Sequence, residues 1–536
     1  MNMLSIFQRQ KLVRQGLSCG KQRRRATEAE WRQWLETGPG WRLLLVGTAG
    51  AAFCLLSLAR ASDPGGWMAA LLEAALVFAG SLLALPFLCP EAGARNSRVL
   101  LIYLVILIHL GVARGVVMFR EESGMWVHLI PAAFAPMMLS VLLGPVAGVF
   151  GAATGTLLVA VAMGERFEAV ATAGLFVGLL GVICTRRVRK RQHIIRAGLC
   201  CGAAGMVCAL AFGLVEGVAA AEALRFAAWA AAVGLLTGFI VNAILPLFEW
   251  LFDITIDVTW LEMADLNHPL LQEMATRAPG TYHHSLVVAN LAEAAAAAIG
   301  ANSLQCRVAC LFHDIGKLVK PEYFVENIGA GDNPHDELSP SMSALIVTSH
   351  VKEGVDLALK HKLNSRIVDA ILEHHGTTLV SYFYARARQQ QRDALEGVRI
   401  LQLREDDVPE VQESTFRYPG PKPRSRETAI LMLADAVEGA SRSLEKPTAQ
   451  RVEELVDSIV RKRIADGQLD DCPISLSDVQ VVAERLAANL KTMMHGRIAY
   501  PKDDDERPAE KERGRRGPDQ SSAALPVAPA KAAPAA

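Results

Sequence analysis

The chain has 536 residues, too many for one ordinary hydrophobic core, so its length predicts at least two domains. Basic and acidic residues balance at 55 each, which argues against a general nucleic-acid binder. Composition changes along the chain. The first half is rich in Leu, Ala, Val and Gly, whereas the second half holds most of the charges and ten of the thirteen histidines. This contrast predicts a membrane part joined to a soluble part.

Eight stretches of the first half are long and apolar enough for transmembrane helices, because a helix crosses a bilayer in roughly 20 residues. They cover about 41–60, 67–89, 98–119, 127–143, 145–163, 167–184, 195–219 and 225–251. The boundary between the fourth and fifth stretches is open, since Gly144-Pro145 is either a tight turn or a kink in a longer helix. The polar lead before residue 41 favours an uncleaved first span over a signal peptide.

Orientation follows from two basic clusters, because Lys and Arg are retained on the cytoplasmic side. One cluster is at 21–25, and the other is at 186–191 between the sixth and seventh stretches. Eight crossings with the N-terminus inside place both clusters, and everything after residue 251, in the cytoplasm. We therefore predict a multi-pass protein of the cell (inner) membrane, with a cytoplasmic segment 1–40 and a membrane domain 41–251.

The second half reads as all-α. A linker is expected over 252–278, with a helix start at Asn267-His268-Pro269, and a helical domain over 279–500. The expected helices of this domain are about 282–299, 303–314, 339–360, 364–374, 424–445, 449–465 and 475–495. A polar, irregular surface insertion is expected at about 386–423. The Ala- and Pro-rich composition near the end predicts a disordered tail over 501–536.

Histidines and aspartates recur in this domain on five separate segments, and a helical bundle can point such side chains at one site. The candidates are His283-His284, His313-Asp314, His350, His374-His375 and Asp435. Imidazoles and carboxylates bind divalent metals such as iron, manganese or zinc, and an acid such as Asp314 can bridge two of them. Adjacent helical residues diverge by about 100°, so we expect only one of His283 and His284 to point inward. His284 is favoured because it shares a face with Val288 and Leu291.

Other polar residues carry two interpretations each. Lys317 follows Asp314 by three residues and is either a contact to a phosphate oxygen or a solvated helix-end lysine. Arg417 and Lys422 belong to a basic loop that could attract an anionic substrate, with a solvated charged loop as the alternative. His268, His335, His361 and His495 stand in polar or capping contexts and are expected at the surface.

The ordered motifs resemble the HD superfamily, specifically its membrane-bound branch, the seven-transmembrane-receptor HD proteins with an HDIG-type domain. The resemblance is carried by Ala278-Pro279-Gly280-Thr281-Tyr282-His283-His284-Ser285, His313-Asp314-Ile315-Gly316-Lys317, Ser349-His350-Val351-Lys352-Glu353-Gly354, His374-His375-Gly376-Thr377, Arg417-Tyr418-Pro419-Gly420-Pro421-Lys422-Pro423, Glu427-Thr428-Ala429-Ile430 and Leu433-Ala434-Asp435-Ala436-Val437-Glu438. Cyclic-di-GMP-specific relatives carry Gly-Tyr-Pro soon after the paired histidines. Here Thr377-Thr378-Leu379 follows Gly376, which favours the cyclic-di-AMP branch.

The resemblance implies a phosphodiesterase that hydrolyses cyclic-di-AMP to pApA with a hydroxide activated by two divalent metals, iron or manganese. The implied metal ligands are His284, His313, Asp314, His350, His374, His375 and Asp435. Asp314 and Lys317 are the implied catalytic residues, with Lys317, Arg417 and Lys422 expected at the substrate. The expected partners are a cyclic dinucleotide and membrane lipid, with a homodimer left open and no nucleic-acid polymer.

The departure from that family lies near the first predicted span. Its members place a large extracellular domain between the first span and the other seven, and this chain has a short loop there, which puts a receptor role in doubt. Two alternatives stay open. One is an HD phosphohydrolase acting on another nucleotide, and the other is a non-catalytic membrane sensor that only binds a nucleotide.

Overall fold

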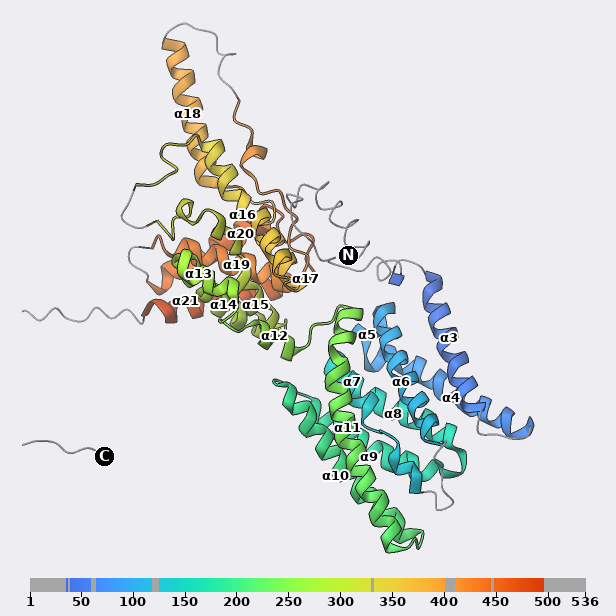
Figure 1. Ribbon diagram of the computed structural model, residues 1–536. Helices are drawn as coiled ribbons and strands as arrows, with labels where there is room; N and C mark the ends of the chain where they lie inside the picture. The colour runs from blue at the N-terminus through green and yellow to red at the C-terminus, as the bar shows by residue number, and fades with distance from the viewer. Residues whose placement is uncertain are drawn as a thin grey trace, which may run out of the picture. The chain divides into compact units, whose positions relative to one another are not determined.

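The computed structural model describes residues 35–36, 39–58, 64–117, 125–328, 332–400, 410–444 and 448–495 (Figure 1). Within these ranges the chain is helical, and β structure is limited to an isolated bridge between Leu379 and Arg417. The predicted all-α fold is confirmed. Most of the predicted segment 1–40 and all of the predicted tail 501–536 lie outside the described residues.

The apolar first half forms helices at each of the eight predicted positions. They are α3 (Pro39–Leu58), α4 (Pro64–Leu88), α6 (Asn96–Val117), α7 (Phe134–Leu143) preceded by the 3-10 turn η1 (Met125–Leu129), α8 (Pro145–Met163), α9 (Phe167–Thr185), α10 (Arg191–Val215) and α11 (Ala220–Phe252). A short helix α5 (Pro90–Ala94) and the 3-10 turn η2 (Gly164–Arg166) connect some of them. Seven of the described helical segments have the length and apolarity to cross a membrane, and the first apolar helix is shorter, at Gly40–Leu56. The protein is thus a multi-pass membrane protein, and a count of eight crossings stays a prediction.

Large apolar side chains cover the outside of these helices. Leu83, Phe87 and Leu214 are 72%, 85% and 84% exposed, which a surface in water would not favour. Lipid is the solvent that suits such side chains. Burial is instead high where helices meet, as in α8, whose middle is enclosed by α4, α7 and α9.

The fourth and fifth predicted stretches are separate helices, and Gly144 lies between them. Its φ of +97° ends α7, and Pro145 begins α8. The two helices then fold back on one another, because a Cβ on Gly148 would lie 2.7 Å from the Cβ of Ser140. The pair is a tight turn between two helices and not a kink in one helix.

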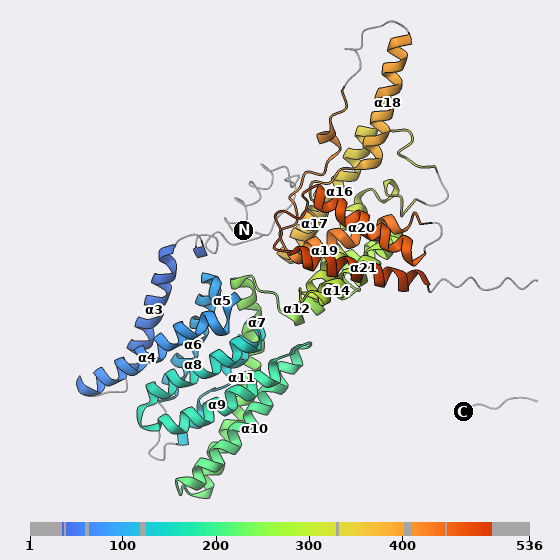
Figure 2. The same cartoon turned by 180° about the vertical axis from the view of Figure 1, so that it is seen from behind.

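Glycines bring α10 and α11 into backbone contact. Gly198 and Gly202 lie four residues apart on α10, as Gly234 and Gly238 do on α11. A Cβ on Gly234 would lie 2.2 Å from the Cα of Gly202, and one on Gly198 would lie 2.7 Å from the Cα of Gly238. This is the small-residue packing through which membrane helices associate, and Figure 2 shows the two helices side by side.

The second half is a separate set of helices. They are α12 (Asp257–Met263), α13 (Pro269–Arg277), α14 (Pro279–Ala298), α15 (Ser303–Phe312), α16 (Pro340–Lys360), α17 (Ser365–Glu373), α18 (Ser381–Ile400), α19 (Arg426–Ser441), α20 (Ala449–Ala465) and α21 (Leu476–His495), with the 3-10 turns η3 (Ile315–Val319), η4 (Pro321–Tyr323) and η6 (Glu413–Phe416). The predicted start at Asn267-His268-Pro269 is confirmed, since His268 caps α13 by accepting from the Leu270 amide at 3.2 Å. The segment expected as a linker contains α12 and α13.

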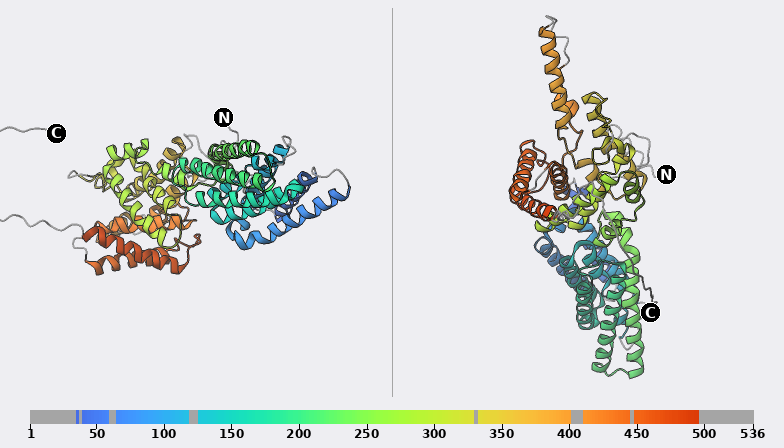
Figure 3. Two further views of the ribbon diagram at one scale, coloured as in Figure 1. Left: turned by 90° about the horizontal axis from the view of Figure 1, so that it is seen from below. Right: turned by 90° about the vertical axis from the view of Figure 1, so that its left-hand side faces the viewer.

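The expectation of an irregular insertion from residue 386 is wrong for its first part. Residues 381–400 form α18, which begins against α16 and runs beyond the other helices of this domain (Figures 1 and 3). Its residues are largely Ala, Arg, Gln, Glu and Leu, which favour helix even where little packs against them. Residues 401–409 lie outside the described ranges, and residues 410–425 return to the domain through η6.

Candidate metal centre

Five segments bring the predicted ligands together, each from a different helix or helix end. His284 lies on α14, His313 and Asp314 directly follow α15, His350 lies on α16, His374 and His375 follow α17, and Asp435 lies on α19. The packing of these helices against one another therefore builds the site. His284 is buried and His283 is exposed, so the inward histidine is the one that the apolar face predicted.

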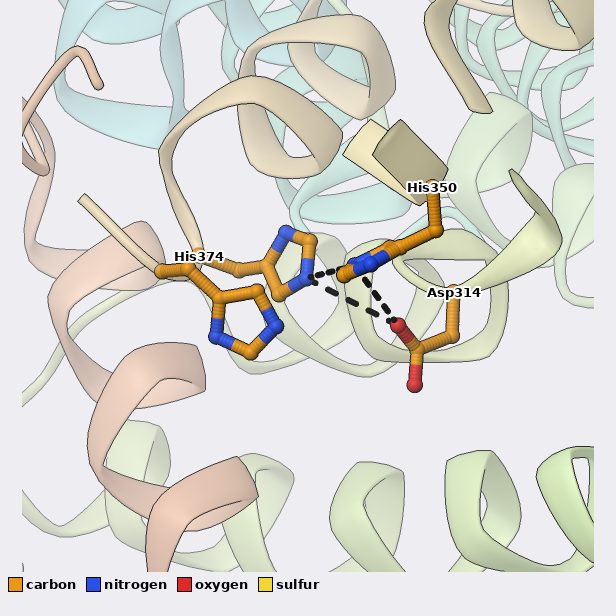
Figure 4. Close-up of side chains that lie close together, drawn as sticks. Asp314, His350 and His374 are labelled. Atoms are coloured by element: carbon orange, nitrogen blue, oxygen red, sulfur yellow. Dashed lines mark hydrogen bonds and ion pairs between the residues drawn. The ribbon is translucent and has the colours of Figure 1, made fainter. Parts of the chain in front are cut away.

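The seven side chains form two groups of possible metal ligands. The first group is His284, His313, Asp314 and Asp435, and the second is Asp314, His350, His374 and His375. Within each group the ligand atoms lie within 4.8 Å of one another. Asp314 belongs to both groups, which is the position of a bridging carboxylate. Figure 4 shows its carboxylate facing the rings of His350 and His374, whose Nε2 atoms lie 3.4 and 3.7 Å from Oδ1.

Backbone carbonyls orient three of the rings in the same way. Nδ1 of His313 lies 2.6 Å from the Cys310 carbonyl oxygen, and Nδ1 of His350 lies 2.6 Å from that of Val347. Nδ1 of His374 lies 2.9 Å from the oxygen of Ile371. In each case the partner is three residues earlier in the chain. An N–H···O bond at Nδ1 leaves the Nε2 lone pair free to bind a metal.

His284 is oriented differently. Its Nδ1 contacts the buried carboxylate of Glu438, while its Nε2 lies 3.0 Å from Oδ1 of Asp435. Glu438 was not predicted as a site residue. The signal was present in the sequence, because Glu438 follows Asp435 by three residues and so shares its helix face.

The charges of the two groups differ. Burial alone would lower the pKa of His313, but Asp314 and Asp435 outweigh it and raise the pKa to about 10. Burial would likewise raise the pKa of Asp314, and His313 and Lys317 hold it well below its usual value. In the second group, burial lowers the pKa of His350 to about 4. Neighbouring carboxylates therefore raise the pKa of His313 in the first group, whereas burial dominates at His350 in the second.

The residues fit divalent cations. Nε2 of His313 and Oδ1 of Asp314 are buried without a hydrogen-bond partner, which is costly unless something else satisfies them. A mixture of imidazole and carboxylate donors suits metals such as iron, manganese or zinc. The arrangement could hold two cations that share Asp314.

Lys317 is not a solvated helix-end lysine. Its Nζ lies 2.8 Å from Asp314 and 2.7 Å from Glu326, and its side chain is 13% exposed. Glu326 also accepts a hydrogen bond from the Thr281 hydroxyl at 3.0 Å. The chain segment around Glu326 thus holds Lys317 beside Asp314. A contact from Lys317 to a phosphate stays a prediction.

A cavity of about 560 Å³ opens beside the second group. Its lining includes Lys317, His350, His375, Tyr418, Phe383 and His335. The Tyr418 ring stacks on His375 with ring centroids 4.2 Å apart. Tyr418 lies in one of the motifs that carry the family resemblance, but only its contact with His375 places it at the site.

The expectation that His335 lies at the surface is wrong. His335 is buried, with Nε2 2.8 Å from the Tyr323 carbonyl oxygen and its ring against Tyr323 and Phe383. Its polar neighbours in sequence hid the aromatic residues that enclose it. His335 forms part of the cavity wall and belongs to neither ligand group.

Arg417 and Lys422 do not line this cavity. Arg417 donates to Asp466 at 3.0 Å and to the Thr377 carbonyl at 2.8 Å, and Lys422 pairs with Asp470 at 3.3 Å. These contacts fix the segment that carries Tyr418. Binding of substrate by Arg417 and Lys422 stays a prediction.

Comparisons with known proteins cover both halves of the chain. Residues 64–255 match the family model described as a 7TM receptor with intracellular HD hydrolase, and residues 281–440 match that of the HD domain. The cyclic-di-AMP phosphodiesterase PgpH of Listeria monocytogenes is 38% identical over 384 residues, which are 70% of this chain and 51% of that protein. PgpH of Bacillus subtilis is 34% identical over 415 residues, or 76% of this chain and 56% of that protein.

The chain therefore spans about half the length of these curated relatives. Among solved structures, the HD domain of L. monocytogenes PgpH in complex with cyclic-di-AMP is 43% identical. That match covers 43% of this chain and 99% of the other, with a TM-score of 0.39.

Proposed function

The chain belongs to the family of 7TM proteins with an intracellular HD hydrolase domain, and from this we propose that it is a membrane-bound, metal-dependent phosphodiesterase that hydrolyses cyclic-di-AMP to pApA. The observation that carries the proposal is the pair of four-residue ligand groups that share Asp314 next to a cavity. Two relatives, at 38% and 34% identity, are cyclic-di-AMP phosphodiesterases.

The proposed cofactors are two divalent cations, iron or manganese. When bound, they would lower the pKa of water and neutralise charge on a phosphodiester. The chain's own part is to hold the ligands rigidly. The helix-backbone bonds to His313, His350 and His374 fix each ring before any cation arrives.

Lys317 and Tyr418 are the proposed substrate contacts. Burial alone would lower the pKa of Lys317, but Asp314 and Glu326 raise it above the usual value, so the ammonium stays charged at the cavity wall. A cation there suits a phosphate oxygen. Tyr418, held against His375, presents an aromatic wall, and the cavity volume lies in the range of small-ligand sites.

We further propose that the HD domain faces the cytoplasm. Support comes from Arg186, Arg187, Arg189 and Lys190, which lie between α9 and α10 and favour the cytoplasmic side. The predicted crossings put an even number of membrane passages between the basic clusters at 21–25 and 186–191, so both clusters lie on the same side. Functional contacts with lipid and assembly into a homodimer stay predictions.

The test uses the full-length protein in detergent micelles, loaded with Mn²⁺ or Fe²⁺ and incubated with cyclic-di-AMP. We expect linear pApA as the product, measured by chromatography, and slower turnover of cyclic-di-GMP. Intact cyclic-di-AMP beside hydrolysis of another nucleotide would make the protein a different HD phosphohydrolase. Binding of cyclic-di-AMP without turnover by metal-loaded protein would make it a sensor.

A further inference from the structure

One suspected ligand, His284, differs from three of the other histidines in the group that its Nδ1 contacts. His313, His350 and His374 each rest on a neutral backbone carbonyl, whereas His284 rests on the carboxylate of Glu438. A carboxylate that is hydrogen-bonded to one nitrogen of an imidazole makes the other nitrogen a stronger ligand for a cation.

Glu438 is itself held in place. Its Oε1 accepts two hydrogen bonds from Arg442, the C-cap residue of α19, at 2.9 Å from Nε and 2.8 Å from Nη2. Its Oε2 is then directed to Nδ1 of His284. Arg442 thus orients Glu438, and Glu438 orients His284.

The count of carboxylates also differs between the groups. The first group contains the carboxylates of Asp314 and Asp435, and Glu438 contacts its His284. The second group contains three histidines and only the shared carboxylate of Asp314. Attraction between a divalent cation and carboxylates is strong at buried positions. The second group is also the one whose His350 and His375 line the open cavity.

We propose that Glu438 is a positioning residue for His284 that makes the two metal sites unequal. The site of His284, His313, Asp314 and Asp435 binds its cation more tightly and fills first. The site of His350, His374 and His375 shares Asp314, fills second and exchanges its cation through the cavity. The inference rests on the proposed metal dependence, but not on the identity of the substrate.

The experiment counts bound cations. Full-length protein in detergent micelles is stripped with a chelator and titrated with Mn²⁺, and free Mn²⁺ is followed by electron paramagnetic resonance. We expect two classes of one Mn²⁺ each. Glu438→Gln should lower the affinity of the tight class by about 10–100-fold, the usual effect of losing such a partner, and leave the weak class unchanged. Glu438→Asp should restore part of the loss.

A second variant tests the site of His350, His374 and His375. His375→Ala should remove the weak class and keep the tight one, which tests the filling order even if Glu438→Gln does not fold. Glu373→Gln is the matched control, because Glu373 is equally buried but its carboxylate accepts hydrogen bonds from the Arg424 amide and the Thr428 hydroxyl. It should leave both classes unchanged.

One class of two equal sites in the unaltered protein would overturn the inference. Equal weakening of both classes by Glu438→Gln, or an equal effect of Glu373→Gln, would assign Glu438 a structural role only. Loss of the tight class in His375→Ala would reverse the filling order. Unequal Mn²⁺ sites in a protein that leaves cyclic-di-AMP intact would refute the proposed substrate and leave this inference standing.

Discussion

The carboxylate of Asp314 belongs to both ligand groups. It is buried, it stands within ion-pair distance of His313, His350 and His374, and it is paired with Lys317. Of its two neighbours in sequence, His313 is a proposed metal ligand and Lys317 is a cation that pairs with it. The same dipeptide on a surface helix would have neither role.

Replacing Asp314 with Asn should abolish binding at both sites, because the amide keeps the shape and loses the charge that they share. Breaking the buried pair with Lys317 should also destabilise the domain by up to about 3–5 kcal/mol. Metal analysis and thermal unfolding of the purified variant measure the two effects. Two cations per chain in Asp314→Asn would show that the carboxylate does not bridge.

The ring of Tyr418 stacks on His375 and forms part of the cavity wall, so we expect the ring to make the substrate contact. Tyr418→Ala should therefore lower kcat/KM for cyclic-di-AMP by roughly fivefold, since such aromatic contacts contribute about 1 kcal/mol. Tyr418→Phe keeps the ring and should stay near the unaltered value. If the two variants lose activity equally, the hydroxyl and not the ring makes the contact.

At the scale of elements, the site depends on how closely helix ends approach one another. Gly316 lies two residues after Asp314, in η3 against α16. A Cβ there would stand 1.8 Å from the carbonyl oxygen of His350 and 2.5 Å from the amide nitrogen of Gly354. Only a residue without a side chain lets η3 reach α16 at this point.

Gly316→Ala should push η3 and α16 apart, cost about 1–3 kcal/mol or more, and weaken cation binding at the site of His350. Thermal unfolding and Mn²⁺ titration measure both. Gly439→Ala is the control, because nothing lies within 4 Å of a Cβ at that position on α19. A Gly316→Ala protein that melts like the control would mean that the contact relaxes without cost.

Element positions were largely predictable from the sequence. Hydropathy located the apolar helices, and caps located helix starts such as His268-Pro269 in the second half. The prediction is wrong for α18, because a polar segment need not be irregular and these residues favour helix. Polarity reports exposure to water, and helix formation depends on backbone preference as well.

At the scale of the whole molecule, the apolar and charged halves are two kinds of structure in one chain. The first exposes large apolar side chains along its helices, and the second buries its apolar residues around a polar site. The basic residues between α9 and α10 predict which side of the membrane carries this site.

That orientation can be tested at Arg187, which is exposed between α9 and α10. Arg187→Cys should react with a membrane-impermeant thiol reagent in inverted vesicles and not in intact cells, because the positive-inside rule places this loop in the cytoplasm. The unaltered protein, with its own cysteines, is the control. Reaction from outside intact cells would reverse the proposed topology.

The sequence by itself predicted the all-α fold and the apolar helices, and together with the family resemblance it named the seven suspected ligands. The fold and the helices follow from hydropathy and local backbone preference, each of which acts over a few neighbouring residues. Only the tertiary structure decided that Glu438 backs His284 across 154 residues, that Tyr418 stacks on His375 and that His335 is buried. It also paired Arg417 with Asp466 and left it out of the cavity wall. Such contacts join distant segments, and the packing of helices selects them from many that local patterns allow equally.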